Sequence, residues 1–151
     1  MSAPLRKLTI LPSREHYLLR IGDGAHFRSS SSRDVWGVHN KTAMKGVLNK
    51  VKKGDFLWFV LGGSKGKLLA VAEYVSHNER ITGPLIALTA TNEELGWTET
   101  PGDWDVEIHY KGLKWLDSQT ILTEIKGGAA GRQYKGATTT PVDLRALSRT
   151  L

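Results

Sequence analysis

Residues 53–61 of the chain read KGDFLWFVL, residues 62–66 read GGSKG, and residues 67–75 read KLLAVAEYV. The stretch from Asp55 to Leu61 is too uniformly apolar for a surface strand, which indicates a central strand of a sheet. The glycine-rich residues 62–66 are typical of a hairpin connection, and residues 67–75 are the expected partner strand. The sequence therefore predicts an antiparallel hairpin in the middle of a sheet.

Before this hairpin the sequence predicts a strand, a loop and a helix. His16 to Ile21 is a short apolar run that ends at a Gly-Asp-Gly turn, as expected of a strand. Arg28 to Asp34 is polar and serine-rich, which predicts a loop, and Val35 to Val38 is a brief apolar patch. From Lys41 to Val51 the apolar residues recur at helical spacing and the lysines lie mostly off the apolar stripe. We therefore expect a helix there, which Gly54 ends.

After the hairpin the predicted elements are shorter. Residues 103–110 alternate between apolar and polar side chains, which predicts a half-buried strand. Lys126 to Lys135 is a basic, glycine-rich segment near the end of the chain. Further short elements are expected at residues 85–89, 91–96, 113–116 and 120–125, and a short helix at residues 141–147. Strands combined with short helices favour a single α+β domain over residues 1–151, with a mixed sheet that is curved or barrel-like.

The composition narrows the class of protein. A chain of 151 residues fits one domain with its own core. Cysteine is absent, which excludes disulfides, zinc–thiolate sites and thiol nucleophiles. Met1 to Leu11 lacks the apolar run of a signal peptide, and no stretch approaches the ~20 apolar residues of a membrane span. These features predict a cytoplasmic or nuclear protein.

The sequence carries no recognisable catalytic or metal-binding motif. It has no HExxH, P-loop or GxSxG pattern, and GGSKG lies between two strands without the P-loop order before a helix. The five histidines show no pair at metal-ligand spacing. Asp103 and Asp105 would share one face of a strand, but solvated carboxylates are the simpler interpretation. We therefore expect a protein that is not an enzyme and holds no metal or cofactor.

Charge and tryptophan content point instead to nucleic acid. The formal net charge is +6 and the pI is about 9.7, a level at which nucleic-acid binding is worth considering. The chain has five tryptophans, and large aromatic side chains either fill cores or form platforms on which bases stack. We expect Trp58, Trp104 and Trp115 to be core residues. The basic charge together with this number of tryptophans therefore favours a protein that binds nucleic acid.

The order and spacing of several short motifs resemble a known family. The motifs are Gly22-Asp23-Gly24, Phe27, Ser30-Ser31, Val35-Trp36-Gly37-Val38, Lys53-Gly54-Asp55, Leu69 to Val75, Asp103 to Val106 and Leu113 to Leu116. Over roughly residues 15–125 they resemble the EVE domain and its relative the YTH domain, both of the PUA-like superfamily. The resemblance implies a PUA-like α+β fold whose curved or barrel-like mixed sheet is flanked by short helices.

The resemblance also implies a pocket in which aromatic side chains clasp a modified base, a methylated adenine or cytosine. Trp36 matches the first cage tryptophan of the YTH pattern, and Trp97 is the best candidate for the second. Asp23 stands near the position of a polar contact to the base edge. Ser30, Ser31 and Asn40 are further candidates for contacts to the base.

Basic residues would hold the phosphates of a single-stranded or flipped-base RNA or DNA, which positions the strand without reading its sequence. The candidates are Arg28, Arg33, Lys41, Lys45, Arg132 and Lys135, with Lys50, Lys52 and Lys53 in addition.

Three alternatives stay open. A PUA-like module without interest in base modification would bind RNA or DNA with an affinity that depends on salt but not on methylation. An interaction or structural protein would use its tryptophans only to fill the core. A small enzyme acting on a nucleotide would need Asp23, Asp103 and His109 to converge in one cleft.

Overall fold

The structure is a computed structural model, and it describes residues 14–22, 24–38, 41–61, 67–79, 106–116, 131–134 and 143–151, with the backbone alone at residues 41–43. Six strands form one sheet in the order β2-β5-β4-β3-β1-β6. Their bounds are β1 (His16–Arg20), β2 (Val35–Val38), β3 (Phe56–Val60), β4 (Leu68–Glu79), β5 (Val106–Trp115) and β6 (Gly131–Tyr134).

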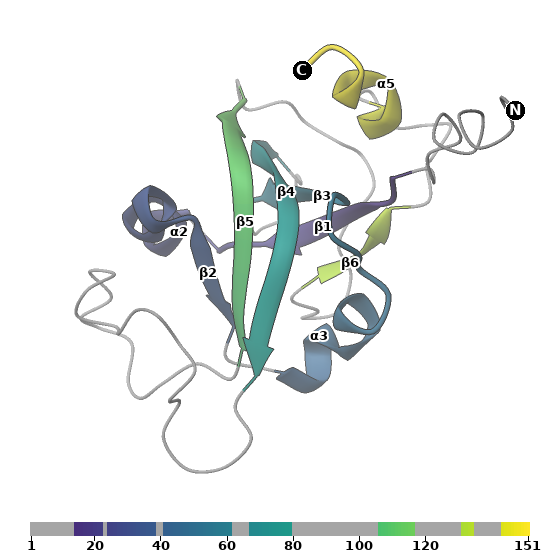
Figure 1. Cartoon of the computed structure of the whole chain (residues 1–151). Coiled ribbons are helices and arrows are strands. Elements are labelled where there is room, and N and C mark those ends of the chain that lie inside the picture. The colour runs from purple at the N-terminus through teal and green to yellow at the C-terminus, as the bar shows by residue number, and fades with distance from the viewer. Residues whose placement is uncertain are drawn as a thin grey trace, which may run out of the picture.

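The sheet is mixed and strongly twisted. β1 and β3 pair in parallel, whereas the other neighbouring strands pair antiparallel. β5 and the lower half of β4 stand upright in Figure 1 while β1 crosses behind them. Within the described strands β2 and β6 are the two edges, so the sheet is curved but is not closed into a barrel.

Short helices complete the α+β fold. They are α2 (Ala25–Ser30), the 3₁₀ helix η1 (Ser31–Arg33), α3 (Lys41–Leu48) and α5 (Leu144–Ser148). The expected α+β class with a mixed sheet and short flanking helices is confirmed. No helix within the described ranges is long and apolar enough to cross a membrane.

The predicted hairpin is present in the sheet as β3 and β4. Phe56 lies opposite Glu73 and Trp58 lies opposite Val71 in an antiparallel register. β3 is the central strand that its uniform apolar sequence predicted, because it is covered on both faces and its last four residues are buried. Its connection, residues 62–66, lies outside the described residues.

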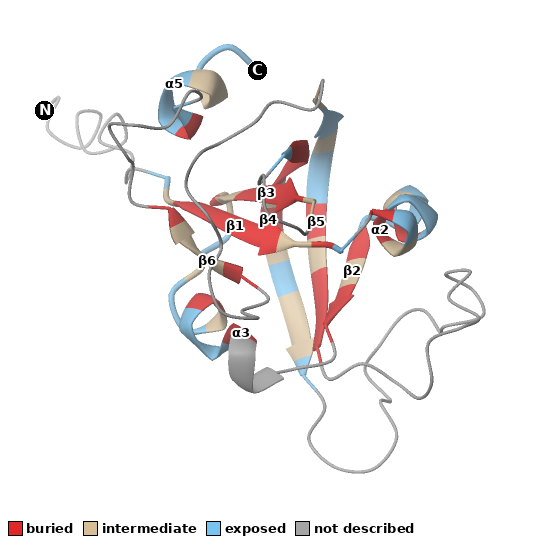
Figure 2. Cartoon of the chain, turned by 180° about the vertical axis from the view of Figure 1, so that it is seen from behind, coloured by how far each residue is buried: buried red, intermediate tan, exposed pale blue. Residues whose placement is uncertain are grey.

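Two cores lie on the two faces of the sheet, because successive side chains of a strand point to opposite sides. On one face, Phe27 of α2 and Met44 of α3 pack against apolar residues of β1, β3, β4 and β5. On the other face, Leu144 of α5 packs with Trp58 and Tyr134. Figure 2 shows burial along most of β1 and β3, the strands that both layers cover.

The prediction of a loop over Arg28 to Asp34 is wrong, since α2 and η1 occupy most of this stretch. Serine disfavours helix interiors because its hydroxyl competes for backbone groups. Here Ser29 Oγ donates to Ala25 O at 3.2 Å and Ser31 Oγ donates to Arg28 O at 2.9 Å. The helix also buries Phe27 completely. The burial of Phe27 therefore outweighs the low helix propensity of the serines, whose hydroxyls bond to carbonyl groups of the preceding turn.

Several strands differ from the expected pattern. The apolar patch at residues 35–38 is strand β2, and residues 113–116 largely continue β5 rather than forming a separate strand. Strand β6 lies inside the basic, glycine-rich segment, where Gly131 lets β6 approach β1 closely. The helix predicted at residues 41–51 is confirmed, although it ends at Leu48. The elements predicted at residues 85–89, 91–96 and 120–125 lie outside the described residues.

Candidate nucleic-acid interface

Trp36 is a half-buried aromatic residue on the edge strand β2. It lies opposite Ile108 of β5 and packs against the core on the α2 side of the sheet. The rings of Trp36 and Phe27 meet edge to face, with their centroids 5.8 Å apart and their planes at 64°. The indole is therefore anchored on one side while part of it remains open to solvent.

Trp115, at the end of β5, is the second tryptophan of this region and is 48% exposed. Its ring also meets Phe27 edge to face, at 5.6 Å and 72°. The guanidinium of Arg28 lies over the indole, with Cζ 5.5 Å from the ring centroid. The prediction that Trp115 is a core residue is therefore wrong.

The physical reason is that β5 runs beyond the part of the sheet that the helices cover. Its first three residues are buried, whereas four of its last five, two lysines, a glycine and Trp115, are exposed. Strand periodicity tells which face a side chain takes but not whether another layer covers that face. The neighbouring Lys111, Gly112 and Lys114 were the available signal for an uncovered strand end.

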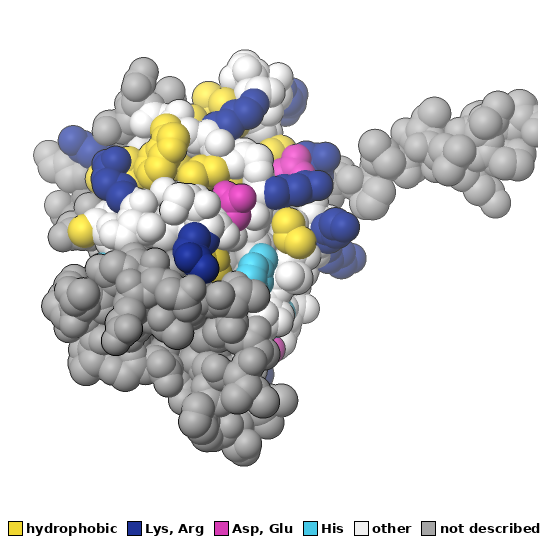
Figure 3. Space-filling model, turned by 60° about the vertical axis from the view of Figure 1, so that its left-hand side comes forward, with side chains coloured by type: hydrophobic (Ala, Val, Ile, Leu, Met, Phe, Trp, Pro, Cys, Tyr) yellow, Lys and Arg dark blue, Asp and Glu magenta, His cyan; other side chains and the backbone are white. Residues whose placement is uncertain are grey.

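Phe27 joins the two tryptophans. It is fully buried and its centroid lies 4.3 Å from that of Phe59, inside the core. Both indoles contact the same phenyl ring, so their centroids are at most about 11.4 Å apart. Figure 3 turns the α2 side toward the viewer and shows a hydrophobic patch with Lys and Arg side chains beside it.

The serines predicted to contact a base are held by α2 and η1. Ser30 is fully buried, and its Oγ donates to Phe27 O at 3.3 Å. Ser31 is half-exposed, and its Oγ donates to the carbonyl oxygen of Arg28. Both hydroxyls thus bond to the backbone of the helix that carries Phe27. The other predicted base contacts, Asp23, Asn40 and Trp97, lie outside the described residues.

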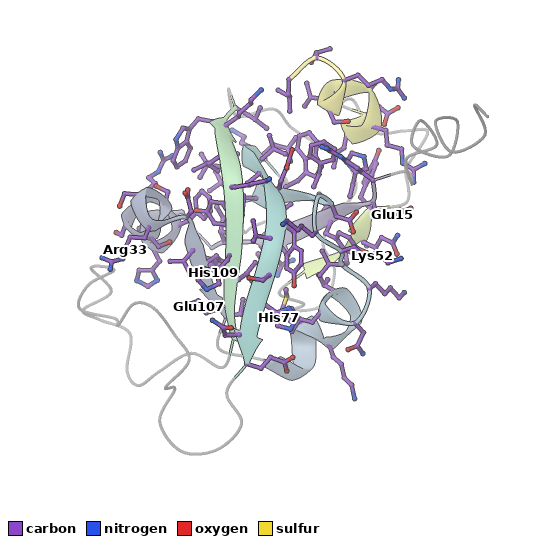
Figure 4. The ribbon with its side chains drawn as sticks, viewed as in Figure 1. Glu15, Arg33, Lys52, His77, Glu107 and His109 are labelled. Atoms are coloured by element: carbon purple, nitrogen blue, oxygen red, sulfur yellow. The ribbon has the colours of Figure 1, made fainter. Side chains whose placement is uncertain are left out.

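The predicted phosphate-binding residues fall into two groups. Arg28 and Arg33 are exposed on α2 and η1, and the guanidinium of Arg28 lies over Trp115. Lys45 is exposed on α3 and Arg132 is half-buried on β6, near the edge of the sheet that lies opposite β2. Figure 4 shows the separation, with Arg33 and Lys52 on opposite sides of the molecule. The side chain of Lys41 and the whole of Lys135 lie outside the described residues.

A hydrogen-bonded group of polar side chains lies along β4 and β5 (Figure 4). His109 Nε2 lies 2.6 Å from Glu107 Oε1, and Glu107 is fully buried although its position in an alternating strand predicted a polar face. On β4, the hydroxyl of Tyr74 lies 2.6 Å from His77 Nδ1. Burial, together with the charge of Glu79, raises the pKa of Tyr74 and keeps this hydroxyl protonated.

These contacts do not test the cleft that the enzyme alternative requires. Of its three residues only His109 is described, because Asp23 and Asp103 lie outside the described ranges. Within those ranges no group of three or more His, Asp or Glu side chains is arranged to hold a metal ion.

A hollow of about 470 Å³ lies between α5 and the start of β1. Its lining includes the arginines Arg14, Arg145 and Arg149. Burial and the charge of Arg145 lower the pKa of His16, which also lines it, while nearby carboxylates oppose this shift. Those carboxylates belong to Glu15, Asp55 and Asp143. They offset the arginines, so the number of arginines overstates the attraction of this hollow for phosphate.

No protein-family model and no curated protein matches the sequence. Among solved structures, a hypothetical protein from Leishmania major is similar, with a TM-score of 0.52 and 13% identity over 91% of this chain and 94% of that one. This likeness supports the α+β fold over most of the chain and assigns no function.

Two YTH domains are also similar, at lower TM-scores. The YTH domain of the Zygosaccharomyces rouxii MRB1 protein, in complex with N6-methyladenosine RNA, has a TM-score of 0.44 and 13% identity over 72% of this chain and 61% of that one. The Pho92 YTH domain in complex with m6A has a TM-score of 0.41 and 17% identity over 74% and 62%. The chain spans less than two thirds of these structures. TM-scores below 0.5 are too low to assign their ligand to this chain.

Proposed function

We propose that this protein is a non-catalytic nucleic-acid-binding domain that takes an unpaired base of RNA or DNA against Trp36. One observation carries the proposal: the indole of Trp36 is only half-buried and is held edge to face by the fully buried Phe27, so an oriented and partly open aromatic ring lies on the edge strand β2. Stacking of a base on an aromatic side chain contributes ~1–3 kcal/mol and tolerates any base. The net charge of +6 adds a sequence-independent attraction for the phosphates.

The finer part of the proposal is that the base is modified, as a methylated adenine or cytosine. It rests on the EVE- and YTH-like order of the sequence motifs, in which Trp36 and Trp97 form the cage. Asp23, Ser31 and Asn40 then lie near the base edge, whereas the fully buried Ser30 bonds to the helix that carries Phe27. A methyl group buried in such a cage contributes about 0.8 kcal/mol, so a preference of tenfold or more requires a close fit. Arg28, Arg33, Lys41, Lys45, Arg132 and Lys135 are the proposed phosphate contacts.

The proposal extends to the organisation of the chain. Residues 1–151 are proposed to form one domain whose core spans about residues 15–125, and a cytoplasmic or nuclear location fits a nucleic-acid ligand.

An RNA- or DNA-binding module without modification specificity is the second candidate function. It is favoured by exposed basic side chains that do not enclose a base pocket within the described residues. A protein-interaction domain is the third, and the exposed Trp115 is the observation in its favour.

The deciding experiment measures binding of short fluorescent single-stranded oligonucleotides at low and moderate salt. Each strand is offered unmodified, with N6-methyladenine and with 5-methylcytosine, to the wild type and to Trp36→Ala. Lys67→Ala, an exposed residue outside every candidate group, is the matched control. We expect about tenfold tighter binding of one modified strand by the wild type and Lys67→Ala, and loss of that preference in Trp36→Ala.

Two results would redirect the proposal. Equal, salt-sensitive binding of all strands that does not depend on Trp36 would leave a module that reads only the backbone. Absence of binding at low salt would favour the protein-interaction domain instead.

A further inference from the structure

We propose that Trp115 and Arg28 form a second nucleotide subsite, beside Trp36, for a neighbouring unpaired nucleotide of the same strand. The base of that nucleotide stacks on the open part of the Trp115 indole, and its phosphate pairs with the Arg28 guanidinium. The inference rests on the proposed function in that the ligand is a single strand. It differs in the base it binds, since Trp115, although it lies within the motif Leu113 to Leu116, is neither a cage residue nor a predicted base contact.

Trp115 is exposed at the surface although its side chain is large and apolar. Trp115 and Leu151 are the exposed large hydrophobic side chains of the described residues, and Leu151 is the last residue of the chain. A single exposed apolar side chain is ordinary on a protein surface and needs no ligand. Trp115 is different because it is a large ring held in place by two defined contacts rather than a solvated side chain.

The pairing of β5 with β4 shows which face of the sheet Trp115 occupies. Trp115 lies opposite Ala70 of β4, and the preceding Lys114 lies opposite Val71. Ala70 belongs to the core beneath α2 and α3, whereas Val71 belongs to the core beneath α5. Adjacent residues of a strand point to opposite faces, so Trp115 shares the face of Phe27 and Trp36 while Lys114 points away.

The ring of Trp115 is held in one orientation by its contact with the buried Phe27. The edge-to-face contact at 5.6 Å ties the Trp115 ring to Phe27, which is buried in the core. An aromatic platform that is already oriented loses little conformational entropy when a base stacks on it. The ring is therefore already oriented in the unbound protein, with about half of the residue's surface exposed, as a stacking site requires.

Arg28 supplies the charge. Its side chain is exposed and forms no ion pair with a described residue, so its guanidinium can take an anionic partner without breaking one. Over the indole, the guanidinium gains a cation–π interaction and still presents N–H donors at its edge. A phosphate accepts those donors in a bidentate pair, the geometry for which arginine is better suited than lysine.

The Trp115 subsite lies close enough to Trp36 for one single strand to contact both rings. The two indole centroids are at most about 11.4 Å apart, and both rings contact Phe27. A single strand whose one base reaches Trp36 can therefore place a base close to it in sequence on Trp115. Single-stranded nucleic acids are commonly bound in this way, by successive bases on aromatic platforms with the backbone along basic side chains.

The test combines protein variants with strands that lack one base. Trp115→Ala, Trp115→Phe, Arg28→Ala and Arg28→Lys are titrated with an unmodified oligonucleotide and with a series in which an abasic residue occupies each position in turn. Lys114→Ala is the matched control, because it removes an exposed charge from the neighbouring residue on the opposite face. Thermal unfolding confirms that each variant is folded, and Trp115→Phe retains an aromatic ring.

We expect Trp115→Ala to weaken binding of the intact strand by about 5- to 150-fold and Trp115→Phe to weaken it less. One abasic position should weaken the wild type by a similar factor and have no further effect on Trp115→Ala. Arg28→Ala should reduce the slope of log affinity against log salt by about 0.7, the value for one phosphate of a single strand, and Arg28→Lys should restore most of that slope.

The Trp115 subsite and the Trp36 pocket can be refuted independently of each other. If Trp115→Ala binds as the wild type does while Trp36→Ala loses binding, the base pocket stands and the second subsite is refuted. If Trp115→Ala and Lys114→Ala weaken binding equally, Trp115 is no specific platform and the subsite is also refuted. If binding depends on Trp115 but not on Trp36, the subsite stands and the Trp36 pocket is refuted.

Discussion

The indole Nε1 of Trp58 donates a hydrogen bond to Nδ1 of His16 at 3.0 Å, across the parallel pair of strands β3 and β1. Both side chains are buried, and their rings are stacked with centroids 6.0 Å apart. Because Nδ1 accepts this bond, the ring proton of neutral His16 sits on Nε2. The contact fixes one tautomer of His16 and satisfies the one polar atom of the Trp58 ring.

This relationship predicts that stability depends on pH. Burial, with the charge of Arg145, lowers the pKa of His16 below its usual value of 6.5, so the folded protein holds His16 neutral where the unfolded chain protonates it. The contribution is therefore present above pH 6.5 and is lost as the pH falls from 6.5 toward the lowered pKa. Urea unfolding between pH 7.5 and 5 should show this loss. His16→Gln retains an acceptor for Trp58 but does not titrate, so an unchanged pH dependence in that variant would contradict the assignment.

Substitution of Asp55 is expected to change the stability of the protein alone. Its buried carboxylate accepts the backbone N–H of Glu15 at 3.0 Å and that of Lys52 at 2.8 Å, which ties the start of β1 to the turn before β3. Asp55→Asn leaves one acceptor oxygen for two donors, so we expect a loss of about 1–3 kcal/mol in the free energy of unfolding. Denaturant unfolding measures it, with the exposed Lys53→Ala as the control. Equal stability of the two variants would show that these hydrogen bonds contribute little.

Two tyrosine hydroxyls predict opposite results. Tyr110 Oη is buried and has no hydrogen-bond partner among the described residues, whereas Tyr74 Oη bonds to His77. Removing an unpaired buried hydroxyl leaves no partner unsatisfied, so Tyr110→Phe should be neutral or stabilising by up to about 1–3 kcal/mol. Tyr74→Phe should cost about 0.5–1.5 kcal/mol. Thermal unfolding of the pair decides the matter, and destabilisation by Tyr110→Phe would indicate a partner for its hydroxyl.

Two glycine substitutions predict opposite results for a steric reason. A Cβ at Gly131 would lie 2.6 Å from Leu19 Cδ2 and 3.0 Å from the Leu18 carbonyl oxygen, so Gly131→Ala should destabilise the β1–β6 pair by about 1–3 kcal/mol. A Cβ at Gly46 of α3 would meet nothing within 4 Å, so Gly46→Ala should stabilise by about 0.5–1 kcal/mol. The midpoints of urea unfolding should therefore move in opposite directions. A tolerant Gly131→Ala would mean that β6 shifts away from β1 at little cost.

Phe27 predicts a link between packing and binding. It contacts both tryptophans and is fully buried, so Phe27→Ala should cost about 3–5 kcal/mol of stability. Phe27→Leu keeps most of the volume but removes the ring edges that orient the indoles. We expect that variant to stay folded and to bind single strands less tightly. Wild-type affinity in a folded Phe27→Leu protein would show that the tryptophans are oriented by other contacts.

Much of the fold followed from local patterns. The uniformly apolar run at residues 55–61, with glycines before its partner, predicted β3 and β4, and the helical spacing after Lys41 predicted α3. The burial of Trp58 followed from its place in the apolar run. The helix α2 was missed, because its serine-rich sequence is stabilised by the burial of Phe27 and not by its own propensity. Strand β6 was missed because its four residues depend on pairing with β1 for their structure.

For the candidate interface, too, some features followed from the sequence and others only from the tertiary structure. The sequence alone determined the basic character of the chain, the absence of thiol chemistry and the central hairpin, because these depend on composition and on neighbours in the chain. The role of Trp36 was inferred from the resemblance between sequence motifs and stays a prediction. Only the tertiary structure decided that Trp115 is exposed, that Arg28 covers it and that Phe27 links it to Trp36. Burial and contact between residues far apart in sequence depend on which layers cover a strand, and a one-dimensional pattern does not contain that information.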